Sequence, residues 1–497
     1  MNLDPDTCYK AVASHDRRFD GRFFVGVSST GVYCRPVCAV RTPRRENCTF
    51  YESAAAAEKH GFRPCLRCRP ELAPGHGLAD ISGRLAQAAA TLIDEGFMAE
   101  GSVTGLAARI GVTERHLRRL FDAQFGVSVL EYAQTQRLLL AKRLLADTAL
   151  PVTEVALAAG FGSVRRFNDV LKTRYGLTPL ALRRRATDGV GDRLVFELGY
   201  RPPLAWEALL GFLATRAVDG IEEIRDGAYA RTLRVEAGGT VYAGWVRIEH
   251  GPRRMVLRVT LSASLARAIP QALGKVRRLC DLGCRPDVVD RHLGELAQAM
   301  PGMRLPGSVD GFEIAVRAVV GQVIPVVHAR RILAAMAQRV ASAEALPEAL
   351  PGSLRFLFPS AAAIVAMPLQ ELRDAGVPAG KARTLQALAQ CVADGTLALD
   401  AHAPPEATVA ALRAIDGIGD WTAQYVAMRA LGWPDAFPGT DYALRKVLGV
   451  DTVRAMQVRT AQWAPWRAYA AVHLWHRYET MKDAPAAPVA REPETMT

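Results

Sequence analysis

The chain has 497 residues and a formal net charge of +12, and 50% of its residues are hydrophobic. This length is too great for one hydrophobic core, so we expect several domains, and the apolar content excludes an intrinsically disordered protein. A membrane span needs a run of about 18 apolar residues, which is absent, and residues 1–6 lack the features of a secretion signal. We therefore predict a cytoplasmic, nucleoid-associated protein without a membrane partner.

Positive charge is concentrated near the N-terminus. Residues 1–185 carry 27 Lys and Arg against 18 Asp and Glu, whereas the remainder carries 35 against 32. A basic region favours a polyanionic partner, most simply nucleic acid, although the charge alone is equally compatible with ordinary solubility.

Residues 1–74 form the first predicted domain and contain two close cysteine pairs, Cys34 with Cys38 and Cys65 with Cys68. In a reducing compartment, clustered cysteines favour metal binding over disulfides, and four thiolates suit the tetrahedral geometry of Zn²⁺. The spacing alone leaves a purely structural zinc knot open. Several arginines crowd the same region: Arg35, Arg41, Arg44, Arg45, Arg63, Arg67 and Arg69.

The segments Thr30–Pro36, Arg45–Asn47 and Gly61–Cys65 resemble the N-terminal domain of the Ada family of adaptive-response proteins. The resemblance implies that Cys34 irreversibly accepts a methyl group from a methylphosphotriester in DNA. Zinc keeps such a thiolate nucleophilic at neutral pH. Methylation then replaces an anionic ligand by a neutral thioether, so the affinity for DNA should rise. The expected phosphate ligands are Arg35, Arg45 and Arg67.

The second predicted domain, residues 80–186, contains two copies of a helix, a Gly turn and a helix, at 106–121 and 155–167. Thr113 is a candidate N-cap for the second helix of the first copy. A generic helical bundle with a solvated basic face is the alternative. The arginines expected on the DNA-facing helices are Arg115, Arg118, Arg119, Arg165 and Arg166.

Residues 167–179 resemble the signature of the AraC family. The resemblance implies two helix-turn-helix units, joined by a long helix over residues 129–145, that reach successive major-groove faces of double-stranded DNA. It also makes RNA polymerase an expected partner. The Pro-Cys-His-Arg acceptor of a second Ada methyltransferase domain does not occur in the sequence, so we expect no repair of methylated guanine oxygen.

The third predicted domain, residues 192–305, has an alternating pattern over 194–260 that predicts an antiparallel sheet. Strands are expected at 231–235 and 255–259, with Gly238 and Gly239 in a turn. The fourth, residues 306–480, is rich in Ala and Leu and predicted to be helical. Residues 484–497 are predicted to be a disordered tail.

Two features of the fourth domain carry its chemistry. A Gly-x-Gly hairpin at Gly417 and Gly419 joins two predicted helices and can offer backbone N–H groups to a DNA phosphate. Asp441 follows at the start of another helix. It is either an ordinary N-cap or a carboxylate that stabilises the positive charge that develops on a sugar during N-glycosidic cleavage.

Residues 192–480 resemble the AlkA family of alkylpurine DNA glycosylases, most clearly at 315–322, at the hairpin and at 463–475. The resemblance implies that Asp441 is catalytic and that Gln322 and Val323 enter the gap left by a flipped nucleotide. Val323 is smaller than the aliphatic residue usual at that position.

The resemblance also assigns Trp475, Tyr425 and Trp421 to a pocket for a flipped cationic base, although Trp421 is equally compatible with a core position. Bifunctional relatives place a lysine two residues after the hairpin glycine, where this chain has Trp421. We therefore predict a monofunctional enzyme that acts on bases of the 3-methyladenine class and leaves an abasic site.

Together these predictions give a multidomain fold: a small zinc-bound α/β domain, an all-α double helix-turn-helix domain, a mixed α/β domain and an all-α helix-hairpin-helix domain. The predicted function is a monomeric alkylation-damage response protein that senses, regulates and repairs. One alternative is a regulator whose glycosylase half is inactive and only binds DNA. Another is an enzyme whose N-terminal half only tethers it to DNA.

Overall fold

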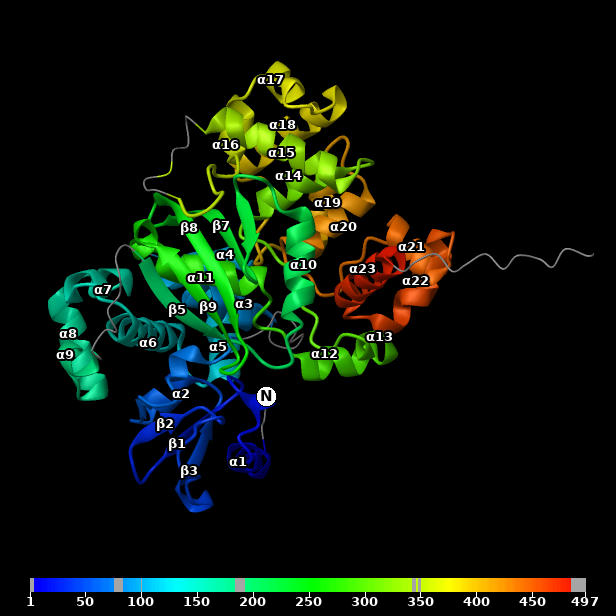
Figure 1. Ribbon diagram of the computed structural model, residues 1–497. Helices are drawn as coiled ribbons and strands as arrows, with labels where there is room; N and C mark the ends of the chain where they lie inside the picture. The colour runs from blue at the N-terminus through cyan, green and yellow to red at the C-terminus, as the bar shows by residue number, and fades with distance from the viewer. Residues whose placement is uncertain are drawn as a thin grey trace, which may run out of the picture.

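The computed structural model describes residues 4–75, 84–99, 101–183, 193–341, 346 and 350–483. The predicted tail, residues 484–497, lies outside the described residues. Figure 1 shows the N-terminal domain below a central sheet, with α16 to α18 above the sheet and α21 to α23 to the right. Among the described residues, no helix is long and apolar enough to cross a membrane.

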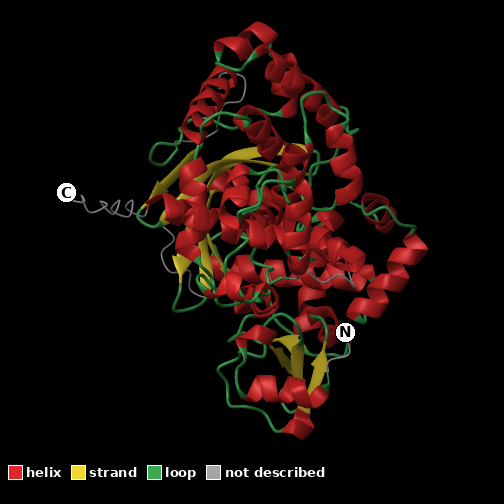
Figure 2. Cartoon of the chain, turned by 90° about the vertical axis from the view of Figure 1, so that its right-hand side faces the viewer, coloured by secondary structure: helices red, strands yellow, loops and turns green. Residues whose placement is uncertain are grey.

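The N-terminal domain is a four-stranded sheet with two helices, visible at the bottom of Figure 2. The strand order is β3-β1-β2-β4, and β2 and β4 pair in parallel, with Tyr33 opposite Pro64. This register brings the residue after Tyr33 close to the residue after Pro64, and both are cysteines. The elements are α1 (Pro5–Ala13), β1 (Phe24–Val27), β2 (Val32–Cys34), β3 (Cys48–Tyr51), α2 (Ala54–Lys59) and β4 (Arg63–Pro64).

The next domain contains the two predicted helix-turn-helix units. Thr113 caps α5, as expected, by accepting a hydrogen bond from the backbone N–H of His116 at 3.3 Å. Ser128 and Glu131 form a capping box at the start of the long connecting helix α6. The helices are α3 (Arg84–Asp94), α4 (Val103–Arg109), α5 (Glu114–Phe125), α6 (Val129–Asp147), α7 (Val152–Ala158), α8 (Val164–Tyr175) and α9 (Pro179–Leu182).

The third domain is a five-stranded antiparallel sheet in the order β5-β9-β8-β7-β6. Both predicted strands are present: 231–235 lies within β7, and 255–259 overlaps β9, which begins one residue later than predicted. The turn at Gly238 and Gly239 joins β7 to β8. The elements are β5 (Arg193–Gly199), α10 (Trp206–Arg216), β6 (Glu222–Arg225), β7 (Ala228–Ala237), β8 (Thr240–Gly251), β9 (Val256–Ser262), α11 (Ile269–Leu279), α12 (Pro286–Leu293) and α13 (Glu295–Gln298).

The remaining described chain is helical, as predicted. One continuous set of buried side chains extends from Leu138 in α6 through the sheet to Trp475, so the last two predicted domains share a core. The helices are α14 (Gly311–Gly321), α15 (Val326–Val340), α16 (Ala361–Ala366), α17 (Leu369–Asp374), α18 (Ala379–Ala393), α19 (Pro405–Arg413), α20 (Asp420–Arg429), α21 (Tyr442–Leu448), α22 (Val453–Thr460) and α23 (Arg467–Asp483).

Polar contacts join the N-terminal half to the rest. The buried Arg201 donates hydrogen bonds to the backbone carbonyls of Asp20 at 3.1 Å, Gly75 at 3.2 Å and Gly283 at 3.1 Å. Ion pairs also link Arg278 with Glu95 and Arg109 with Asp400. The N-terminal domain is therefore fixed against the sheet domain by specific bonds.

Candidate functional site

The Gly-x-Gly hairpin lies between α19 and α20 and requires glycine at its first position. Gly417 has a φ of +88°, and a Cβ atom there would lie 2.2 Å from the Thr384 hydroxyl oxygen. That hydroxyl donates a hydrogen bond to the Asp416 carbonyl at 2.8 Å and so supports the turn. Gly419 is the N-cap of α20 and brings no side-chain cap, which leaves the first N–H groups of the helix available to a phosphate.

The predicted wedge loop, which joins α14 to α15, is attached to this hairpin. The Gln322 amide donates hydrogen bonds to the Gly417 carbonyl at 3.0 Å and to the Thr422 hydroxyl at 2.9 Å. Lys381 donates to the Gln322 carbonyl at 2.6 Å. The next residue, Val323, has a φ of +57° and is fully exposed. Because a β-branched residue is strained in that conformation, the loop presents Val323 outward at a cost.

Asp441 receives three N–H donors. The backbone N–H of Leu444 donates to Oδ1 at 3.1 Å, so Asp441 is the N-cap of α21. The Trp475 indole also donates to Oδ1 at 3.1 Å, and the Trp421 indole donates to Oδ2 at 2.9 Å. The carboxylate therefore has a fixed orientation between two of the predicted pocket residues, and its capping role and a catalytic role are compatible.

Aromatic rings line the side of this carboxylate. Trp421 stacks on Tyr425 with ring centroids 5.2 Å apart and planes 10° apart. Tyr425 and Trp475 lie 6.0 Å apart. Phe212 of α10 stacks against Trp475 at 6.4 Å. Sequence reasoning missed Phe212, because it comes from the sheet domain and no local pattern distinguishes it from the other apolar residues of its helix.

Two guanidinium groups contact these rings. Arg429 donates to the Tyr425 hydroxyl at 3.0 Å, and its guanidinium lies 4.9 Å from the Phe212 ring centroid. Arg216 lies 3.8 Å from the same centroid. Burial raises the pKa of Tyr425, but Arg429 and Arg216 outweigh this effect, so its pKa lies below the usual value. The Tyr425 ring consequently has a polar, positively charged neighbourhood at its hydroxyl end.

The four predicted zinc ligands meet in the N-terminal domain. The Sγ atoms of Cys34, Cys38, Cys65 and Cys68 all lie within 4.8 Å of one another. Backbone N–H groups of Arg35 and Arg67 donate to Cys68 Sγ and Cys65 Sγ, each at 3.4 Å, which stabilises thiolates. A compact set of four thiolates fits tetrahedral zinc, and these residues form a zinc site.

The predicted phosphate ligands around this site differ in their surroundings. The Arg35 side chain is bound to the Asp20 carboxylate, with a Nε–Oδ1 distance of 2.8 Å, and to the Cys68 carbonyl at 3.1 Å. Arg45 lies 3.3 Å from Asp6, whereas Arg67 is exposed. Arg35 is therefore built into the zinc site, and Arg67 is the most open of the three to DNA.

The predicted DNA-facing arginines of α5 and α8 are all exposed. Arg118 forms an ion pair with Glu114 one turn earlier at 2.5 Å. The buried residues of α8 are Phe167, Leu171 and Tyr175, and Arg165 and Arg166 are exposed away from them. This distribution is that of a helix packed on one side and available to a groove on the other.

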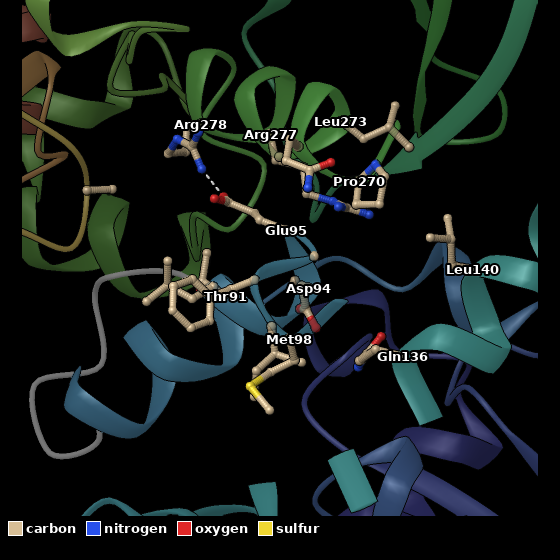
Figure 3. Close-up of a pocket in the computed structure, with 18 of the residues that line it drawn as sticks. Thr91, Asp94, Glu95, Met98, Gln136, Leu140, Pro270, Leu273, Arg277 and Arg278 are labelled. Carbon is tan, nitrogen blue, oxygen red and sulfur yellow. Dashed lines mark hydrogen bonds and ion pairs between the residues drawn. The ribbon is translucent and has the colours of Figure 1, made fainter. Parts of the chain in front are cut away.

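A cavity of about 1020 Å³ lies elsewhere, between α3, α6 and α11. Figure 3 shows Arg277 and Arg278 above it and Asp94 and Gln136 below it, with Arg278 paired to Glu95. Burial raises the pKa of Asp94 to about 7. None of the predicted site residues lines this cavity.

Three family models match successive parts of the chain. They are the metal binding domain of Ada over residues 7–71, a helix-turn-helix domain over 106–185 and the AlkA N-terminal domain over 195–310. These matches confirm the resemblances inferred from the motifs, including that of the sheet domain.

Curated relatives match the whole chain or parts of it. The chain is 40% identical to a probable bifunctional transcriptional activator/DNA repair enzyme AlkA of Mycobacterium tuberculosis, over 96% of this chain and 97% of the relative. It is 36% identical to DNA-3-methyladenine glycosylase 2 of Escherichia coli, over 57% of this chain and 97% of the relative. It is also 36% identical to the bifunctional transcriptional activator/DNA repair enzyme Ada of E. coli, over 36% of this chain and 49% of the relative.

Proposed function

Because this chain belongs to the family of bifunctional transcriptional activator/DNA repair enzymes, we propose that it senses methylated DNA at Cys34 and removes alkylated bases with Asp441. The protein is an alkylation-damage response protein that binds DNA and has DNA-3-methyladenine glycosylase activity. The observation that carries the residue assignment is the Asp441 carboxylate, held by two indole N–H groups beside a set of aromatic rings.

In the proposed glycosylase reaction, the damaged nucleotide leaves the duplex and its base lies against Tyr425 and Trp475. An alkylated purine of the 3-methyladenine class already carries positive charge, so it is attracted to π-faces and leaves without a general acid. Asp441 stabilises the positive charge that develops on the sugar and orients the attacking water. Trp421, where bifunctional enzymes have lysine, makes the reaction monofunctional and the product an abasic site.

We assign the binding of damaged DNA by the glycosylase half to the hairpin and the wedge loop. The backbone N–H groups at Gly417 and Gly419 bind a phosphate, and Val323 fills the space of the flipped nucleotide. Gln322 holds these two segments in register through its bonds to Gly417 and Thr422. Val323 is small, but its full exposure and its strained φ support its role as the inserting residue.

The proposed methyl transfer takes place at Cys34. Its Sγ attacks the methyl carbon of a methylphosphotriester, an S–C bond forms, the C–O bond breaks, and the phosphodiester leaves with the electron pair. The four cysteines would hold zinc, which would keep the attacking sulfur in its thiolate form. Arg67 and Arg45 attract the DNA backbone, while Arg35 orients the Cys68 loop.

Methylation removes one negative charge from a DNA-facing surface, so binding becomes tighter. The exposed arginines of α5 and α8 then contact two successive major grooves, and we propose that the bound monomer recruits RNA polymerase. The methyl acceptor and the glycosylase would thus respond to the same class of alkylating agent.

The decisive experiment compares the wild type with Asp441→Asn. Asn retains helix capping, so the variant should fold, but release of 3-methyladenine from methylated DNA should fall about a hundredfold or more. Equal release by both proteins would mean that the glycosylase half is inactive or that another residue is catalytic.

Mass spectrometry of the Cys34 peptide after incubation with methylphosphotriester DNA tests the second activity, which is methyl transfer. Cys48→Ser is its control because Cys48 lies outside the zinc cluster.

A further inference from the structure

A buried carboxylate lies where the zinc-binding domain meets the second helix-turn-helix unit. Glu58 of α2 is 5% exposed. Its Oε1 accepts hydrogen bonds from the Tyr33 hydroxyl at 3.1 Å and the Tyr175 hydroxyl at 2.9 Å. Its Oε2 accepts one from the Thr135 hydroxyl at 2.9 Å. One side chain of the first domain therefore binds three hydroxyls from three different elements.

The three hydroxyl donors lie next to the methyl acceptor, in the connecting helix α6 and in α8. Tyr33 is fully buried in β2 and directly precedes Cys34. Thr135 lies within α6, the helix that joins the two helix-turn-helix units. Tyr175 is the last residue of α8, the second recognition helix. Apolar packing supports the same junction, since Tyr33 belongs to a buried cluster that includes Leu139 of α6.

We propose that Glu58 is a positioning residue that holds the recognition helix α8 in a fixed place relative to the methyl acceptor Cys34. The inference rests on the proposed role of Cys34. It adds that the zinc domain and the second helix-turn-helix unit meet DNA as one body, so that the affinity gained on methylation includes contacts made by α8.

The physical basis is the cost of leaving buried hydroxyls unpaired. A hydroxyl bonded to a carboxylate makes a strong hydrogen bond in a buried site, and replacement of the carboxylate by an amide removes its charge and turns one of its two acceptor oxygens into a donor. Burial raises the pKa of Glu58 to about 7, although the three hydroxyls act in the opposite direction. Burial of the Glu58 carboxylate therefore costs free energy, and the three hydrogen bonds to hydroxyls offset part of that cost.

The test uses the full-length, zinc-loaded protein and fluorescence anisotropy with an arbitrary labelled duplex of about 40 base pairs. The duplex is long enough for both units, which are expected to contact faces one helical turn apart. Each protein is measured before and after Cys34 is methylated by an oligonucleotide that carries one methylphosphotriester. Affinity is recorded over a range of salt concentrations, because the slope of log K against log salt reports the number of phosphates contacted.

We expect methylation to raise both the affinity and the salt slope of the wild type. In Glu58→Gln and in Tyr175→Phe, the methylation rate and the zinc content should be unchanged. The methylation-dependent gain in affinity should fall about tenfold, and the slope should lose about one or two phosphate contacts. Glu406→Gln, which removes one exposed carboxylate in the first turn of α19, should behave as the wild type.

Three outcomes decide the matter. Glu58→Gln and Tyr175→Phe proteins that keep the full gain and the full slope overturn the inference. If affinity falls equally before and after methylation, Glu58 only supports folding, and the inference is overturned as well. Thermal unfolding of Tyr175→Phe, which removes one oxygen atom, distinguishes this outcome from misfolding. A wild type that is methylated but gains no affinity overturns the proposed switch itself, and the inference with it.

Discussion

At the scale of single residues, Asp441 combines an observed helix-capping role with the catalytic role proposed for it. The helix cap uses one carboxylate oxygen, and the two indoles hold both oxygens in place. A carboxylate oriented in advance has little to reorganise as positive charge develops on the sugar, which is how fixed charges lower a barrier. The indoles therefore hold the orientation of Asp441 in addition to the contact with the base that we propose for them.

Trp475→Phe separates these two contributions. The ring remains for stacking, but the N–H donor to Asp441 is lost, so we expect the single-turnover rate of 3-methyladenine release to fall about tenfold, as for the loss of one hydrogen bond to a charged group. Trp245→Phe, in β8 of the sheet domain, is the control and should retain the wild-type rate. An unchanged rate in Trp475→Phe would show that orientation by this indole is unimportant.

Asp281 gives a pH prediction. Burial raises its pKa to about 6, against the opposing effect of Arg304. The folded state therefore holds this proton more tightly than the unfolded chain, whose aspartates titrate near 3.9. This stabilisation is fully present below about pH 4 and is lost as pH rises through about 6.

Between pH 4 and 7, the free energy of unfolding of the wild type, measured with urea, should thus fall by up to about 3 kcal/mol relative to that of Asp281→Asn. Asn tolerates the left-handed backbone of this position, where φ is +46°. Parallel pH profiles for the two proteins would show that Asp281 does not titrate in this range.

At the scale of elements, the hairpin was predictable because its determinants are local. The two glycines and the flanking helices lie within a few residues of each other, and the structure places them as the sequence indicates. The contacts that complete the site are not local. Phe212 reaches it from α10, and Gln322 reaches the hairpin from the end of α14. Periodicity predicts which face of a helix is buried but does not identify its partner.

The zinc domain gives the same contrast. The spacing of its cysteines indicates the cluster that the structure contains. The ion pair of Arg35 with Asp20 is not indicated by any pattern, because it depends on where the loop after α1 lies in space. Sequence pattern therefore identifies the ligands but cannot rank the arginines around them.

The two hairpin glycines should respond differently to substitution. Gly417→Ala meets Thr384 and requires a positive φ, so we expect the free energy of unfolding to fall by about 1–3 kcal/mol, with weaker DNA binding. Gly419 has a φ of −85°, and a Cβ atom there would meet nothing within 4 Å, so Gly419→Ala should change stability by less than about 0.5 kcal/mol. Urea unfolding of both variants measures this, and equal losses would contradict the steric account of Gly417.

At the scale of the whole molecule, the chemistry of the two proposed reactions is separated although the domains are packed together. The zinc cluster lies in the small N-terminal sheet domain, and Asp441 lies at the start of α21, to the right of the central sheet in Figure 1. The boundary predicted at residues 305 and 306 divides a continuous core. Alternation followed by helical periodicity indicates two domains, but a shared core leaves no trace in local pattern.

Removal of zinc should affect the two activities unequally. With a strong chelator, the N-terminal sheet loses its cross-links, so methyl transfer to Cys34 should cease and an early unfolding transition should appear. Release of 3-methyladenine should persist, because no residue that contacts Asp441 belongs to the zinc cluster. Differential scanning calorimetry and the base-release assay measure both effects, and a parallel loss of both activities would contradict the separation.

Arg201 has a consequence for any attempt to take the protein apart. Its guanidinium is only 3% exposed and binds carbonyls of the N-terminal half, and burial lowers its pKa to about 10. A glycosylase half produced alone from residue 193 would keep this cation while losing the Asp20 and Gly75 carbonyls. Separation of the two halves would therefore exchange these hydrogen bonds between protein groups for hydrogen bonds to water.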